Sequence, residues 1–172
     1  AAVDWREAVV WLERHVTGGY LWPAAAAPSP RSEGSVTGQS QSPLRLPQRD
    51  NRMLGPVRAY LTGNRHLAAS LLEPLLQSGK LYADHRGNAV FLLVAGKAQR
   101  PVGAELRGTG PRIWRGMAPG TRKEEGYFWT GVPGSREIVL CESAIDAISC
   151  FQIHPECMCI STTITAWRCW LP

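Results

Sequence analysis

Two carboxylates near the end of the chain are spaced so that they could act on one ligand. Glu142 closes a short strand-like segment whose apolar run is residues 138–140, and Asp146 follows four residues later in a helical pattern. A strand that leads directly into a helix puts its last residue at the carboxyl edge of a sheet, where open α/β sheets hold ligands. Because Asp146 lies one helical turn along, both carboxylates can point into one space.

Such a pair suits a hard divalent cation. Mg²⁺, or Mn²⁺ in its place, binds a few carboxylates and completes its coordination with water or phosphate. The alternative is structural: Glu142 lies beside a helix N-terminus and is favoured by the helix dipole, while Asp146 is a solvated residue on the helix face. The spacing alone leaves both interpretations open.

The segment before this pair is strongly basic. The chain has a net charge of +5, and residues 80–136 carry ten basic and four acidic side chains, whereas residues 137–172 carry one basic and four acidic. Two Gly-rich loops are expected at 107–112 and 114–123, where backbone amides and basic side chains could hold phosphates and an indole could stack on a base. Ordinary surface turns are the alternative. The candidate phosphate-binding residues are Arg107, Arg112, Trp114, Arg115, Arg122 and Lys123.

The elements that must position these residues have a recognisable order. Helices are expected at 57–61 and 67–77, with a kink or break at Pro74, then a hairpin of strands 80–83 and 89–95 and a third strand at 101–106. A buried strand at 138–140, a helix at 143–151 and a strand at 158–161 follow. The expected fold class is α/β: an α+β part with antiparallel strands, followed by an incomplete parallel α/β sheet.

The beginning of the chain has a different composition. Residues 4–16 form an amphipathic helical pattern, and residues 22–51 are rich in Pro, Ser and Ala, which is typical of an extended or disordered linker. We therefore expect an N-terminal helix at 1–21, a linker at 22–51, a basic helix-and-strand domain at 52–135 and a partial sheet domain at 136–172. The chain has no apolar run that could span a membrane, so no membrane partner and a cytoplasmic location are expected.

All the cysteines lie in the last part of the chain. This clustering does not suit a secreted disulfide framework, which would spread over the chain. His154, Cys157 and Cys159 have a loose metal-ligand spacing, but the Cys-x-Cys pair lacks a second pair, so buried free thiols are favoured over zinc. The five cysteines are Cys141, Cys150, Cys157, Cys159 and Cys169.

Four phrases in this order carry a resemblance to a known family. They are LYADHRGNAVFLL, GAELRGTG, WRGMAPGTRKEEGYFW and IVLCESAIDAIS, and the match that rests on them extends over roughly residues 52–161. The chain resembles primase-like Toprim proteins of bacteria, plasmids and mobile elements, which often accompany zinc-binding, relaxase or helicase modules. The run DWREAVVWLERHV is similar to the tail of such a zinc-binding module. The parallel sheet would then be an incomplete Toprim sheet.

The resemblance implies a function in DNA replication or in plasmid and mobile-element maintenance, with Mg²⁺-dependent phosphoryl or nucleotidyl transfer. Glu142 would be the catalytic general acid/base or a metal ligand, and Asp146 a supporting acid near the metal. The partners would be DNA, single-stranded in the first instance, or RNA, together with nucleotides. The reaction itself, whether priming, nicking or joining, stays open.

This sequence departs from the family pattern in two ways. Ser143 stands where the family usually has Gly, and no Asp-x-Asp follows Glu156 before the ending TTITAWRCWLP. We expect this ending to be a truncation, a shifted frame or a short form, and we expect little or no strand synthesis by the chain alone. Two alternatives are a non-catalytic nucleic-acid-binding module and an unrelated α/β protein that binds a phosphorylated small molecule.

Overall fold

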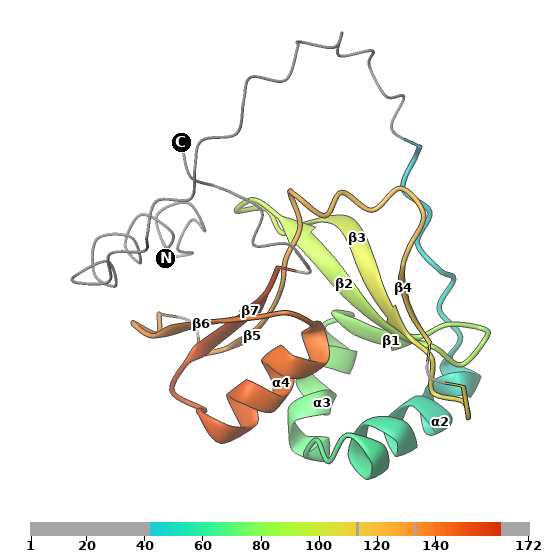
Figure 1. Cartoon of the computed structure of the whole chain (residues 1–172), viewed down its shortest axis with the longest axis horizontal. Helices are drawn as coiled ribbons and strands as arrows, with labels where there is room; N and C mark the ends of the chain where they lie inside the picture. Colours follow the sequence, from blue (N-terminus) through green and yellow to red (C-terminus); the bar gives the residue numbers. More distant parts are fainter. Residues whose placement is uncertain (1–41, 113, 133, 163–172) are drawn as a thin grey trace, which may run out of the picture.

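The computed structural model describes residues 42–112, 114–132 and 134–162 of the 172-residue chain (Figure 1). The predicted helix at 4–16, most of the predicted linker and the last ten residues lie outside the described residues. The described part combines an antiparallel four-stranded sheet, a small mixed sheet with one parallel pair, and three α-helices, so the predicted α/β class is confirmed. None of the described helices is long and apolar enough to cross a membrane.

The first sheet is a continuous antiparallel meander in the order β1-β2-β3-β4. Its strands are β1 (Leu81–Ala83), β2 (Ala89–Ala95), β3 (Arg100–Arg107) and β4 (Arg115–Met117). The predicted hairpin and third strand are therefore confirmed. The hairpin turn is organised by Asp84, whose carboxylate accepts hydrogen bonds from the backbone amides of Arg86 at 2.9 Å and Asn88 at 2.8 Å. An aspartate that bonds its own turn in this way favours tight reversal of the chain.

Strand β4 corrects the prediction of a loop over residues 114–123. Arg115 pairs with Arg107, Gly116 with Leu106 and Met117 with Glu105. An edge strand of three residues that contains a glycine has almost no local β signal, because its strand character comes from pairing with β3. The same register shows that Arg107 belongs to β3, so the prediction that it begins a loop is also wrong.

Helices precede the first sheet. A 3₁₀ turn η1 (Asn51–Met53) leads into α2 (Leu54–Ala59), which continues as the π-helical turn η2 (Tyr60–Asn64), and α3 (Ala69–Gln77) follows. The two predicted helices are thus confirmed with shifted ends. Helix α3 continues through Pro74. A proline removes the bond to the carbonyl four residues earlier, and Ser70 at that position is exposed, so water can satisfy it.

The second sheet contains a β-α-β unit. Strand β6 (Ile138–Cys141), helix α4 (Ala144–Ile153) and strand β7 (Met158–Ser161) follow one another, and β6 and β7 pair in parallel. Strand β5 (Phe128–Gly131) pairs antiparallel on the other side of β7, giving the order β5-β7-β6. The predicted strand–helix–strand order is confirmed. The prediction that the first of these strands is buried is wrong, because β6 lies at a sheet edge and Leu140 is 45 % exposed.

One hydrophobic core joins the helices to both sheets. It contains Val57 of α2, Leu72 of α3, Phe91 of β2, Ile148 of α4 and Cys159 of β7. Because side chains alternate along a strand, Phe91 and its cross-strand partner Glu105 face the helices, whereas the smaller cluster around Tyr82 lies on the opposite face.

The opposite face of the first sheet is lined by residues 42–50, which run as an extended segment alongside it (Figure 1). The Arg49 guanidinium lies 5.1 Å from the centre of the Tyr82 ring, and the Tyr82 hydroxyl donates a hydrogen bond to the Pro47 carbonyl at 3.0 Å. The Arg45 amide donates to the Pro119 carbonyl at 2.9 Å. This segment therefore packs on the sheet through side-chain and backbone contacts.

Candidate functional site

Glu142 lies at the carboxyl edge of the parallel pair, as the sequence predicts. It follows β6 directly and precedes Ser143, the N-cap residue of α4, and it is exposed. The carboxyl ends of parallel strands form the edge at which α/β folds bind ligands. Glu142 is therefore accessible to a ligand from solvent.

Asp146 stabilises the start of α4. The Ser143 hydroxyl accepts a hydrogen bond from the Asp146 amide at 3.3 Å and donates one to the Asp146 carboxylate oxygen Oδ2 at 2.7 Å. An acidic residue in the first turn is also favoured by the helix dipole. Asp146 is exposed, as the structural alternative supposes, and in addition one of its carboxylate oxygens bonds the N-cap hydroxyl.

A third carboxylate meets the same helix end and was missed by sequence reasoning. Glu105 of β3 is only 6 % exposed, and its Oε2 accepts a hydrogen bond from the Ala144 amide at 2.9 Å. Burial raises the pKa of Glu105, and the nearby Asp146 charge raises it further, while the Ala144 hydrogen bond and the charges of Arg107 and Arg115 act in the opposite direction. These groups therefore form one electrostatic cluster at the start of α4.

Arg107 belongs to this cluster and is buried. Its Nη2 lies 3.5 Å from Glu105 Oε1, and its side chain is 9 % exposed. Its Nε is buried and has no hydrogen-bond partner among the described residues. Arg115 is the cross-strand partner of Arg107, so both side chains leave the sheet on the same face, but Arg115 is exposed.

The remaining predicted phosphate contacts are not gathered at this point. The Trp114 ring lies against the position that a Cβ of Gly116 would take, which is the sheet face opposite to Arg107 and Arg115. The Arg122 amide bonds the Val102 carbonyl, so Arg122 lies beside β3 five residues from Arg107, or about 16 Å at the usual strand rise. Lys123 follows it in an exposed turn, and Arg112 is exposed in the β3–β4 connection.

A sequence signal for Glu105 exists in the phrase VGAELR. Ala104 and Leu106 are apolar and lie on one face of this strand, whereas the alternate positions carry Glu105 and Arg107 two residues apart, next to a long apolar strand. Opposite charges at such spacing share one face. The signal indicates a buried ion pair once the strand is known to lie inside the sheet.

The described cysteines form no disulfide: Cys157 and Cys159 are buried, as predicted, whereas Cys141 and Cys150 are only partly buried, and Cys169 lies outside the described residues. Burial raises the pKa of Cys141 and Cys157 to about 11 and that of Cys159 to about 12. Thiols with raised pKa values are poor nucleophiles at neutral pH, so none of these three suits a catalytic nucleophile.

The fold and the cluster define a mixed α/β protein in which a buried Glu–Arg pair on an antiparallel sheet holds the start of the helix of a β-α-β unit. Residues 59–131 match the family model described as "Protein of unknown function (DUF3991)". The matched segment contains Glu105, Arg107 and Arg115 and ends before Glu142. The description states no activity and names neither a primase nor a Toprim protein. Comparisons with curated proteins and with solved structures gave no match.

Proposed function

We propose that this chain binds nucleic acid, single-stranded DNA in the first instance, along β3 and β4. We further propose that it acts in the manner of a primase-like Toprim protein, with Mg²⁺-dependent phosphoryl or nucleotidyl transfer at Glu142 in a form that also supplies the Asp-x-Asp absent from this sequence, and that the chain alone supports little or no strand synthesis. One observation carries the proposal: Glu105 is bonded to Ala144, two residues after Glu142, and is flanked by Arg107 and Arg115. Basic groups beside an exposed acidic edge suit an enzyme that handles a polyanion with a cation.

The basic residues have different roles in this proposal. Arg107 is too buried to reach a polymer in solvent, so we assign it the positioning of Glu105 and of the start of α4. Arg115 and Arg112 are exposed and would contact phosphates, as would Arg122 and Lys123 further along β3. The Trp114 ring, just before β4, lies on the sheet face opposite to Arg115, so a nucleic-acid strand that follows this edge could stack on Trp114 while its phosphates meet Arg115.

The carboxylates at the edge fit a hard cation. Glu142 is exposed, and no hydrogen bond within the described residues uses Oδ1 of Asp146, so each can offer an oxygen. Mg²⁺ prefers such oxygen ligands and keeps several waters. When bound, the ion would neutralise negative charge on a phosphate and help to orient it. The exposed basic residues named above would hold the phosphate beside the ion and exclude other orientations of the phosphate.

The test is fluorescence anisotropy of a labelled single-stranded DNA titrated with the protein at several salt concentrations, with and without Mg²⁺. Affinity should fall as salt rises, and Arg115→Ala should lower the magnitude of the log–log slope by about 0.7, the value for one phosphate contact on a single strand. Arg100→Ala is the matched control, because Arg100 is an exposed arginine at the other end of β3. Its slope should stay within error of the wild type.

A second pair of variants tests the cation. The Mg²⁺-dependent gain in affinity should disappear in Glu142→Gln and persist in Glu124→Gln, an exposed glutamate in the turn after Lys123. Salt-dependent binding that ignores both Mg²⁺ and Glu142 would instead identify a non-catalytic nucleic-acid-binding module. Binding of nucleotides or sugar phosphates with no affinity for DNA or RNA at low salt would refute the proposal.

A further inference from the structure

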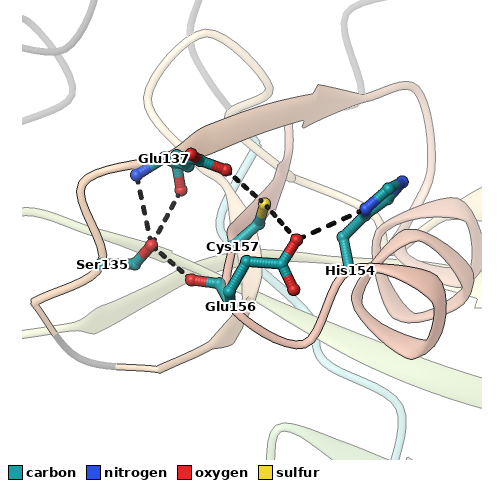
Figure 2. A network of polar contacts seen from close by, with 5 residues as sticks. All are labelled: Ser135, Glu137, His154, Glu156 and Cys157. Carbon is teal, nitrogen blue, oxygen red and sulfur yellow. Dashed lines mark hydrogen bonds and ion pairs between the residues drawn. The ribbon is translucent and has the colours of Figure 1, made fainter.

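A second cluster of polar side chains lies at the amino edge of the parallel pair, the opposite end from Glu142. Glu137 immediately precedes β6, and His154, Glu156 and Cys157 form the turn between α4 and β7 (Figure 2). The two segments meet because the Met158 amide donates a hydrogen bond to the Glu137 carbonyl at 2.8 Å. Because this cluster lies at the opposite edge from Glu142, any ligand that it binds is independent of the function proposed above.

The side chains of this cluster converge on one another. Cys157 Sγ lies 3.4 Å from Glu137 Oε2 and 3.9 Å from Glu156 Oε1, and one ligand atom from each of the three residues falls within 4.8 Å of the others. Figure 2 shows the sulfur between the two carboxylates. Cys157 is only 4 % exposed, so a buried thiol is directed at two acidic groups that are themselves exposed.

These separations resemble those between ligands of one metal ion. With Zn–S near 2.3 Å and Zn–O near 2.1 Å, ligands at tetrahedral angles lie roughly 3.4–3.6 Å apart. The sulfur is 3.4 Å from one carboxylate oxygen and 3.9 Å from the other, so small side-chain rotations would bring all three onto one ion. A purely acidic surface cluster lacks such a sulfur ligand and favours hard cations instead.

The backbone that carries these ligands is fixed before any ion arrives. The Ser135 hydroxyl lies 2.6 Å from the Glu156 carbonyl oxygen and 3.1 Å from that of Glu137, and it accepts a hydrogen bond from the Glu137 amide at 3.2 Å. One side chain therefore ties together the two segments that present the carboxylates. His154 Nδ1 lies 3.5 Å from Glu156 Oε1, where it can orient that carboxylate.

We propose that Glu137, Glu156 and Cys157 bind a divalent transition-metal ion of the zinc class, with His154 as the positioning residue for Glu156. A thiolate with carboxylate and imidazole neighbours selects zinc or cobalt over magnesium and calcium. On binding, the metal–sulfur bond replaces the S–H bond of Cys157, and the proton passes to solvent. The two glutamates are exposed, so water completes the coordination.

The experiment is a titration of the reduced, metal-free 172-residue protein with Co²⁺, followed by absorption. A cobalt–thiolate bond gives a charge-transfer band in the near ultraviolet, and added Zn²⁺ should remove the band by displacing cobalt. The band should be absent in Cys157→Ser. Glu137→Gln and Glu156→Gln, at exposed positions that should not disturb folding, should each weaken cobalt binding by at least about tenfold. His154→Ala should weaken it while keeping the band.

Cys150→Ser is the matched control, because Cys150 belongs to a neighbouring group of thiols with Cys141 and Cys159, whereas Cys157 is the thiol that contacts the two glutamates. It should keep the band and the affinity. A band that survives in Cys157→Ser but is lost in Cys150→Ser would place the ion on that other group and overturn the proposal. No band at millimolar cobalt, or unchanged affinity in both glutamate variants, would overturn it as well. None of these outcomes depends on DNA binding.

Discussion

Replacing Arg107 with leucine should destabilise the protein strongly at neutral pH. Arg107→Leu removes the guanidinium 3.5 Å from Glu105 and leaves that carboxylate buried, with the Ala144 amide as its remaining hydrogen-bond donor. Removing one partner of a buried ion pair typically costs about 3–5 kcal/mol. Because Glu105 keeps one donor, we expect the lower end of that range, about 3 kcal/mol, which for a chain of this size lowers Tm by about 6–12 °C.

The loss should depend on pH, and its sign follows from the raised pKa of Glu105. A carboxyl whose pKa is higher in the folded state holds a proton there that the unfolded chain has released. The stability contributed by Glu105 is therefore greatest at acidic pH and falls as pH rises through its folded-state pKa. The Arg107 charge opposes this rise in pKa, so Arg107→Leu should cost less free energy of unfolding at pH 5 than at pH 7.

Urea unfolding, followed by tryptophan fluorescence at both pH values, measures the effect. Glu105→Gln and the double variant complete a cycle in which the coupling energy should be about 1–3 kcal/mol. Arg100→Leu, an exposed arginine on the same strand, should change the free energy of unfolding by no more than about 0.5 kcal/mol. A cost below about 1 kcal/mol for Arg107→Leu, or the same cost at pH 5 and pH 7, would refute the reasoning.

Two further substitutions test local packing. Ser143→Ala removes the hydroxyl that caps α4 and should lower the free energy of unfolding, measured by calorimetry, by about 1 kcal/mol. Ser143→Asp should retain most of the stability. Equal Tm values for the alanine variant and the wild type would contradict the cap. Gly120 has φ +75°, and a Cβ there would lie 2.5 Å from the Pro43 carbonyl oxygen. Gly120→Ala should therefore loosen residues 42–50 and speed trypsin cleavage after Arg45, while Gly110→Ala, which meets open space, should not.

The elements that could be predicted are those with a complete local signal. The hairpin of β1 and β2 has two apolar runs around an Asp-x-x-Gly turn, and α4 begins with Ser143 and Asp146 at capping spacing. The position of Glu142 followed from the same local order, because a strand that runs into a helix fixes which sheet edge the intervening residue occupies.

What could not be predicted depends on partners far away in the sequence. Glu105 accepts a hydrogen bond from the amide of Ala144, 39 residues later, and no local sequence pattern predicts that contact. Strand β4 forms because its residues pair with β3, and β6 is only partly buried because it is an edge strand among the described residues. The cluster at Glu137 and Cys157 likewise joins two segments that only the parallel pairing of β6 and β7 brings together.

These long-range contacts also bear on which part of the chain forms the candidate site. The segment that matches the family model ends at residue 131, yet its last strand, β5, pairs with β7, and its buried Glu105 is satisfied by the first residue of α4. Without the β-α-β unit, Glu105 would lose its amide donor and β5 would lose its ladder. The basic residues of the matched segment and the carboxylate edge at Glu142 therefore depend on each other for their positions. The candidate site therefore lies where the segment matched by the family model meets the β-α-β unit.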